Sequence, residues 1–218
     1  MDPFAGRPTK TKALAAIEEA VSVYRRLAEA RPEAVLPKLA SSLNEQAIRL
    51  GALRRREEAL AAVEEAVAIR RRLVEADPDA SRPDLASSLK QQAIRLGALG
   101  RHEEALVAVE EAVSVYRRLV EARPEAFIRD LATSLNDLSV RLGELGRAEE
   151  ALATIENAIY SALPMLERRP DALPSSGIAL LQSYLELCEQ LERPPDDEVL
   201  GRMSDVLESA GLLPSEDE

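Results

Sequence analysis

The sequence contains one cysteine and one histidine, so several kinds of chemistry have no residues to perform them. Cys188 alone cannot form an intramolecular disulfide. It follows an apolar pattern with Leu181, Leu185 and Leu191, and we expect it to be a small buried core residue. The sequence has no His-Glu-X-X-His motif, no clustered Cys/His set and no glycine-rich phosphate loop. We therefore predict that the protein holds no metal and no cofactor.

Positive charge and long apolar runs are also lacking. The formal net charge is −11, whereas a nucleic-acid binder needs a basic face to replace phosphate counterions. Two arginine runs, 54–56 and 70–72, adjoin glutamates, and we interpret them as solvated helix faces. No run approaches the roughly 20 apolar residues that cross a membrane, and residues 1–10 contain no signal-peptide h-region. These observations predict a cytoplasmic protein with no nucleic-acid or membrane partner.

What the chain does contain is helix-forming sequence. Hydrophobic residues make up 46% of the 218 residues, aromatic residues only 3%, and Ala, Leu, Glu and Arg dominate. β-branched residues never alternate over a run, so nothing indicates a strand. The composition predicts an all-α protein with enough apolar mass for a continuous core.

The dominant feature is an internal repeat with a constant period of 46 residues. Three independent markers show it: Leu14, Leu60, Leu106 and Leu152; Pro32, Pro78, Pro124 and Pro170; and Leu43, Leu89, Leu135 and Leu181. A constant period without insertions indicates a stacked array in which each unit contacts mainly its neighbours.

Each unit is predicted to contain two helices. In the third unit, a first helix over 128–144 has leucines at helical spacing, and a second begins near Arg147 with two glutamates that complement its N-terminal dipole. Tripeptides such as 31–33 are expected to connect the units. Pro37 and Pro83 then belong to the first turn of the next helix, and Pro164 predicts a kink or an early end.

The junction between the two helices reads Gly-Arg-X-Glu-Glu-Ala-Leu at 100–106 and 146–152, with small residues such as Ala151 and Ala158 in the second helix. This pattern resembles tetratricopeptide repeats. HEAT and armadillo units also repeat every 40–47 residues, but they lack this junction. The usual tetratricopeptide unit is 34 residues. The longer unit here is similar to the repeats of kinesin light chains, and Arg54 occupies a usual glycine position. The composition also resembles repeat regions of bacterial regulators and scaffolds.

The resemblance implies a right-handed α-solenoid of antiparallel helix pairs with about nine helices. We expect one domain over residues 9–211: a lone helix (9–30), three full repeats (36–76, 82–122 and 128–168) and a C-terminal capping pair (174–211). Residues 1–8 and 212–218 are expected to be disordered tails.

In this family the first helices of the units line a concave groove. The resemblance therefore implies a partner-binding groove formed by three rows of residues. The rows are Ser41, Ser87 and Thr133; Asn44, Lys90, Asn136 and Gln182; and Ile48, Ile94 and Val140, with Glu186 following in the fourth unit. Amide side chains can donate to and accept from a peptide backbone at once, and the Ile/Val row adds apolar contact.

These features predict a non-catalytic scaffold that binds a protein or peptide. The lone His102 lies at a helix junction and is assigned a packing role; in a linear stack it lies two repeats from Cys188. Two alternatives remain open. The unpaired helix 9–30 could join copies of the chain into a self-assembling module, or the repeat could be a ligand-sensing segment of a larger regulator.

Overall fold

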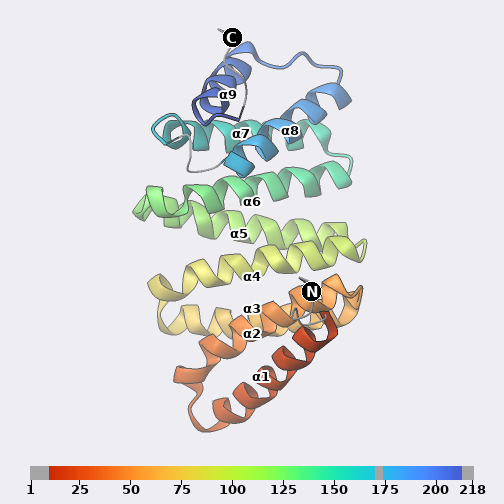
Figure 1. Cartoon of the computed structure of the whole chain (residues 1–218), viewed down its shortest axis with the longest axis vertical. Helices are drawn as coiled ribbons and strands as arrows, with labels where there is room; N and C mark the ends of the chain where they lie inside the picture. Colours follow the sequence, from red (N-terminus) through yellow and green to blue (C-terminus); the bar gives the residue numbers. More distant parts are fainter. Residues whose placement is uncertain (1–9, 170–173, 213–218) are drawn as a thin grey trace, which may run out of the picture. The chain divides into compact units, whose positions relative to one another are not determined.

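The computed structural model describes residues 10–169 and 174–212. Over these residues the chain is all-α, with nine helices and no strand (Figure 1). The helices are α1 (Lys10–Ala30), α2 (Pro32–Ala52), α3 (Arg56–Ala76), α4 (Pro78–Ala98), α5 (His102–Ala122), α6 (Pro124–Glu144), α7 (Ala148–Leu166), α8 (Pro174–Gln190) and α9 (Asp197–Ser209). None of these helices is long and apolar enough to span a membrane.

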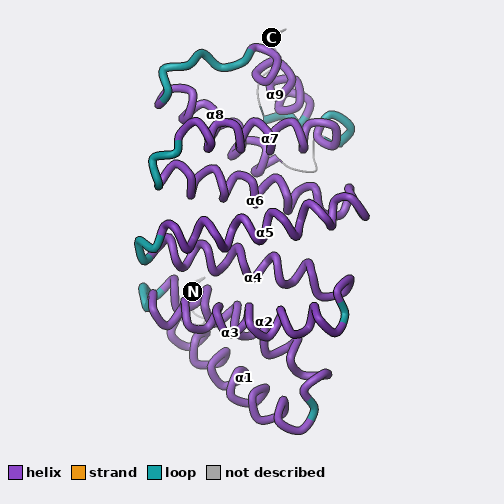
Figure 2. Tube along the Cα trace, turned by 180° about the vertical axis from the view of Figure 1, so that it is seen from behind, coloured by secondary structure: helices purple, strands orange, loops and turns teal. Residues whose placement is uncertain are grey.

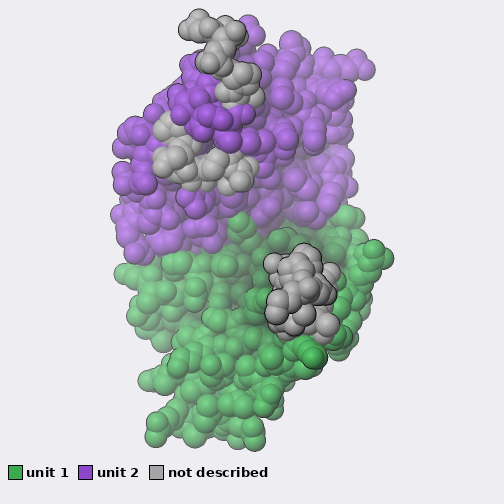
Figure 3. All heavy atoms as spheres, in the orientation of Figure 1, with its two compact units in different colours: residues 1–108 green, residues 109–218 purple. Residues whose placement is uncertain are grey.

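The chain divides into two compact units, residues 1–108 and 109–218 (Figure 3). In unit 1, α1 packs on α2, α2 on α3 and α3 on α4. In unit 2, α6 packs on α7, α7 on α8 and α8 on α9, while α6 also contacts α8. Within each unit, consecutive helices run antiparallel and are joined mostly by short turns (Figure 2). The single domain expected over 9–211 stays a prediction.

The connectors between repeats are shorter than predicted. Pro32, Pro78 and Pro124 are the first residues of α2, α4 and α6, so each connector is a single residue and not a tripeptide. A proline suits this position because the first N–H of a helix has no intrahelical acceptor. Pro37 and Pro83 consequently lie inside their helices, beyond the first turn that the sequence suggested.

The turn inside each repeat requires a left-handed residue. Gly100 and Gly146 have φ values of 75° and 73°, and Arg54 adopts φ 61° at the equivalent position. The following N–H then donates to a carbonyl five residues back, as Arg55 does to Leu50 and Arg101 to Leu96, both at 3.0 Å. The glycines expected at this junction are therefore explained by backbone geometry, with Arg54 as the exception.

Alanines let α3 approach α2 and α7 approach α6 closely. The alanines at the two small positions of each second helix are fully buried: Ala59, Ala66, Ala105, Ala112, Ala151 and Ala158. Leucines from the first helices, such as Leu43, Leu89 and Leu135, complete the core. Both sets match the predicted packing positions.

The C-terminal helices differ from the prediction in detail. Cys188 is buried as expected, but Leu185 is exposed, and Leu180, Tyr184 and Leu187 form the buried side of α8. The predicted buried stripe included Leu185 because every apolar residue at helical spacing was counted. The neighbouring helices instead cover a side of α8 that is shifted by one residue. Helix α7 ends two residues after Pro164, which agrees with the predicted early end.

Candidate partner-binding groove

The exposed β-branched side chains of α2 and α4 mark the candidate groove in unit 1. Ile48 and Ile94 are 40% and 38% exposed, although the alanine before each, Ala47 or Ala93, is buried. Ser41 and Ser87 are also exposed, and Lys90 is half-buried. An isoleucine that remains in water at the same position of two repeats gives each helix an apolar contact point outside the core.

Asn44 belongs to the same row but is only 9% exposed. Its Nδ2 donates to the Ser88 hydroxyl at 2.9 Å, which joins α2 to α4. Its Oδ1 is buried and has no hydrogen-bond partner among the described residues. A buried acceptor without a partner is costly, so the free lone pairs of Asn44 mark a point where a donor would be favourable.

The position of Arg70 differs from the solvent-exposed one that was predicted from the sequence. Its side chain comes from α3 and is buried at 5% exposure, whereas we expected the run 70–72 to be a solvated face. Its guanidinium donates to the backbone carbonyl of Asp84, lies 3.3 Å from the Ser41 hydroxyl and 3.8 Å from the Asp84 carboxylate. These contacts compensate the buried positive charge. Arg71 and Arg72 are exposed, as predicted for this run.

Arg95, one residue after Ile94, folds back against α2. A Cβ built on Gly51 would overlap Nη1 of Arg95 and lie 3.1 Å from its Cζ. The guanidinium therefore covers the backbone at Gly51, and its Nη2 donates to Gln91 Oε1 at 3.3 Å. Partial burial lowers the pKa of Arg95 from its ordinary value, because the charged guanidinium loses hydration.

In unit 2 the corresponding residues lie on α6 and α8. Val140 is 39% exposed, Gln182 is exposed, and Asn136 carries a buried Oδ1 without a partner among the described residues. The Thr133 hydroxyl donates to the Asp130 carbonyl at 3.1 Å. Val140 therefore matches the exposure of Ile48 and Ile94, whereas the amide row is more exposed at Gln182 than at Asn44.

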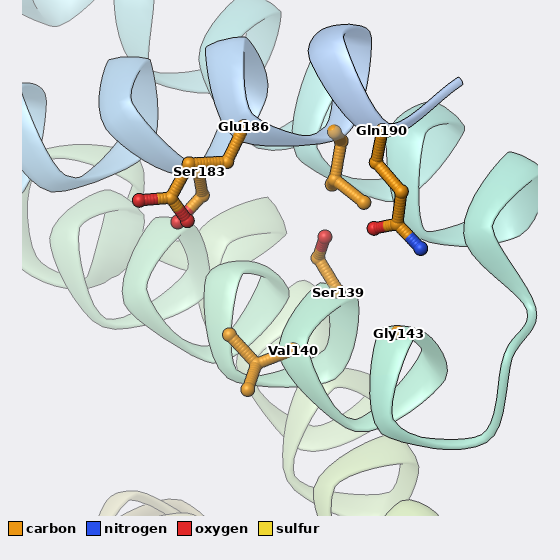
Figure 4. Close-up of a pocket in the computed structure, with 7 residues that line it drawn as sticks. Ser139, Val140, Gly143, Ser183, Glu186 and Gln190 are labelled. Carbon is orange, nitrogen blue, oxygen red and sulfur yellow. The ribbon is translucent and has the colours of Figure 1, made fainter.

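A cavity of about 190 Å³ opens beside Val140 (Figure 4). Its described lining is Ser139, Val140, Gly143, Ser183, Glu186, Leu187 and Gln190. The Ser139 hydroxyl donates to the Ala151 carbonyl at 2.8 Å, so its lone pairs remain available. In Figure 4 the oxygens of Ser183 and Glu186 lie together on α8, and the Gln190 amide points toward α6. Sequence reasoning placed Glu186 in the apolar row but did not find the cavity, because its walls come from helices two apart in the chain.

The arrangement offers groups that can bind a partner. Among the described residues, no cluster of three or more His, Cys, Asp or Glu could hold a metal ion. His102 is the first residue of α5 and is partly buried. The repeated glutamates at 58, 104 and 150 each pair with an arginine three residues earlier.

Comparisons with known proteins agree with the helical-repeat fold. Residues 39–79 and 85–124 match the family model of the tetratricopeptide repeat. No curated protein is similar to the chain in sequence. The fold is similar to that of the Podosopora anserina putative kinesin light chain nearly identical TPR-like repeats, with a TM-score of 0.69 and 19% identity, covering 94% of this chain and 90% of that one. It is also similar to BtubC (BKLC) from P. vanneervenii, with a TM-score of 0.57 and 18% identity, covering 94% of this chain and 86% of that one.

The fold and the exposed rows therefore define an α-helical repeat of the kind that serves as a protein-interaction scaffold. Residues 39–79 and 85–124 match tetratricopeptide repeats, and the all-α repeat fold predicted from the sequence is confirmed. Tetratricopeptide repeats generally bind proteins, and the family is typically non-catalytic.

Proposed function

We propose that this protein is a non-catalytic scaffold that binds a protein or peptide along the first helices of its repeats. The predicted contact residues are those of the three rows on α2, α4, α6 and α8. The cytoplasmic location belongs to the same proposal.

The exposed row of Ile48, Ile94 and Val140 is the observation that supports it. All three lie at 38–40% exposure on helices whose other large apolar residues are mostly buried. Apolar side chains repeated in register on a surface mark an interaction site more strongly than scattered ones. The adjacent amide row would add donors and acceptors for an extended peptide where its members are exposed, as Gln182 is.

The test begins with peptides selected from a displayed random library against the full chain. Fluorescence polarisation of the best peptide would then be compared for wild type, Ile48→Asp, Ile94→Asp and Val140→Asp. Each substitution is expected to weaken binding by about tenfold or more, because a charge replaces a buried apolar contact. Val107→Asp is the matched control, since Val107 is 63% exposed on α5, a second helix of a repeat. Equal losses for Val107→Asp and the three row variants would contradict the assignment of the groove.

Self-assembly is a second candidate that a separate observation favours. Helix α1 corresponds to the second helix of a repeat, and its Leu27 and Val23 are 50% and 36% exposed. This apolar surface could pair with another copy of the chain. A ligand-sensing role within a larger regulator remains compatible with the same groove.

A further inference from the structure

The cavity between α6 and α8 has a counterpart between α2 and α4. Two periods of the repeat align Gly143 with Gly51 and Val140 with Ile48 on the first helix. On the second helix they align Leu187 with Arg95 and Glu186 with Ile94. The same place in the fold therefore occurs in each unit, with the glycine in common and different side chains at the other lining positions.

In unit 1 an arginine of the chain itself fills the site. The Arg95 guanidinium lies over Gly51, where any side chain on residue 51 would overlap it. Ile48 precedes Gly51 by about one turn of α2, and Gln91 accepts a hydrogen bond from Arg95 Nη2 at 3.3 Å. The glycine backbone and the polar acceptor thus accommodate one guanidinium.

In unit 2 the corresponding site has no arginine and contains a carboxylate. Leu187 stands where unit 1 has Arg95, and a Cβ built on Gly143 would have no atom within 4 Å. The space is a cavity of about 190 Å³, suitable for one side chain and too small for a drug-sized ligand. Its described lining contains the Glu186 carboxylate and no cation. Glu186 replaces Ile94, so the change adds negative charge where a guanidinium lies in unit 1.

We propose that this cavity receives an arginine side chain of the partner protein. The aliphatic part would lie along Val140 and Leu187, and the guanidinium over Gly143 would donate to Glu186. Charge-assisted, planar donors of this kind are best matched by a carboxylate, which favours arginine over lysine. The proposal rests on the proposed scaffold function and names one chemical feature of its partner.

The direct test uses N-acetyl-arginine amide as the probe and ¹H–¹⁵N NMR spectra of the full chain. The expected result is a saturable shift of the Val140, Gly143, Ser183 and Glu186 cross-peaks, with a dissociation constant of about a millimolar, as suits one side chain. The neutral isostere N-acetyl-citrulline amide should cause no such shift. Equal shifts with citrulline, or no shift with arginine, would overturn the proposal. Tighter binding of N-acetyl-lysine amide would overturn the choice of arginine.

Two variants assign the binding to the cavity. Glu186→Gln should weaken arginine binding by about fivefold or more, whereas Glu189→Gln, on the same helix but outside the described lining of the cavity, should leave it unchanged. Gly143→Leu should abolish binding by filling the cavity. It should fold, because its Cβ meets no neighbour and leucine favours a helix over glycine. Retained binding in Glu186→Gln and Gly143→Leu would contradict the site.

A transfer of the site to unit 1 gives the sharpest outcome. The double variant Ile94→Glu with Arg95→Leu removes the internal guanidinium and installs the carboxylate of unit 2. It should add a second arginine site with shifts at Ile48 and Gly51. Unchanged stoichiometry would count against the pairing of glycine and carboxylate as the recognition element.

The two proposals can fail separately. If the peptide selected for the groove still depends on Ile48, Ile94 and Val140 but N-acetyl-arginine amide does not bind, the scaffold function stands and the arginine pocket is wrong. If neither binds, the groove itself is wrong.

Discussion

The side-chain amide of Asn44 donates to the hydroxyl of Ser88 at 2.9 Å, so the first helices of two adjacent repeats are joined by a buried hydrogen bond. Ser88 is fully buried, and Asn44 nearly so. Lys90 replaces the asparagine in the next repeat, so the bond belongs to this pair of helices and is no general property of the repeat.

Asn44→Ala should lower the free energy of unfolding by about 1–2 kcal/mol, because it leaves the Ser88 hydroxyl buried with one partner fewer. Urea denaturation of Asn44→Ala, Ser88→Ala and the double variant would give the coupling between them, expected near 1 kcal/mol. Ser87→Ala is the matched control, since Ser87 is exposed, and it should change stability by less than about 0.5 kcal/mol. Strict additivity of the two single variants would show that the bond contributes nothing.

Arg54→Gly should stabilise the chain by about 1 kcal/mol. Arg54 holds φ at 61°, a left-handed conformation that costs a residue with a Cβ roughly this much, while Gly100 and Gly146 occupy the equivalent turns. The measurement is the shift in urea midpoint at constant m-value. The reciprocal variant Gly100→Arg should destabilise by a similar amount, and an opposite sign for either variant would refute the backbone explanation.

The arginine–glutamate pairs at the repeat junctions should make stability fall in acid. The hydrogen bond from Arg101, at 2.6 Å, lowers the pKa of Glu104 from its ordinary value of 4.5. Because the pKa is lower in the folded state, the pair stabilises fully above pH 4.5, and this contribution is lost as the pH falls through the folded pKa. A ¹³C NMR titration of the Glu104 carboxyl should show the depressed pKa in wild type. Arg101→Gln should return it toward 4.5, and an unchanged titration in that variant would exclude the pair as the cause.

The exposed face of α1 should decide the oligomeric state. If α1 pairs between copies, multi-angle light scattering over a hundredfold concentration range should show a dimer or a ladder, and Leu27→Glu should restore the monomer. Ala15→Glu, on an exposed small residue of the same helix, is the control and should not change the mass. A monomer at every concentration would remove self-assembly from the candidate functions and leave the groove as the only proposed contact surface.

The repeat period, the helix pairs and the buried alanines were all predictable from the sequence. They depend on local preferences: helix-forming residues, a left-handed turn that favours glycine, and apolar residues at a spacing of three and four. The packing role of Ala151 and the turn at Gly146 could be predicted from one repeat alone, because the same local geometry recurs in every repeat. The connectors were misjudged because a proline at a helix start and a proline in a loop look alike in sequence.

The sequence by itself thus determined the class of fold and the positions at which the three rows repeat. Only the tertiary structure decided how the side chains in and near those rows are placed. Asn44 is withdrawn into a bond with Ser88, Arg70 is buried against α4, and Arg95 covers Gly51 while Leu187 leaves Gly143 open. These differences arise because a side chain's surroundings come from the neighbouring repeat, 46 residues away, and small substitutions there change the space it meets.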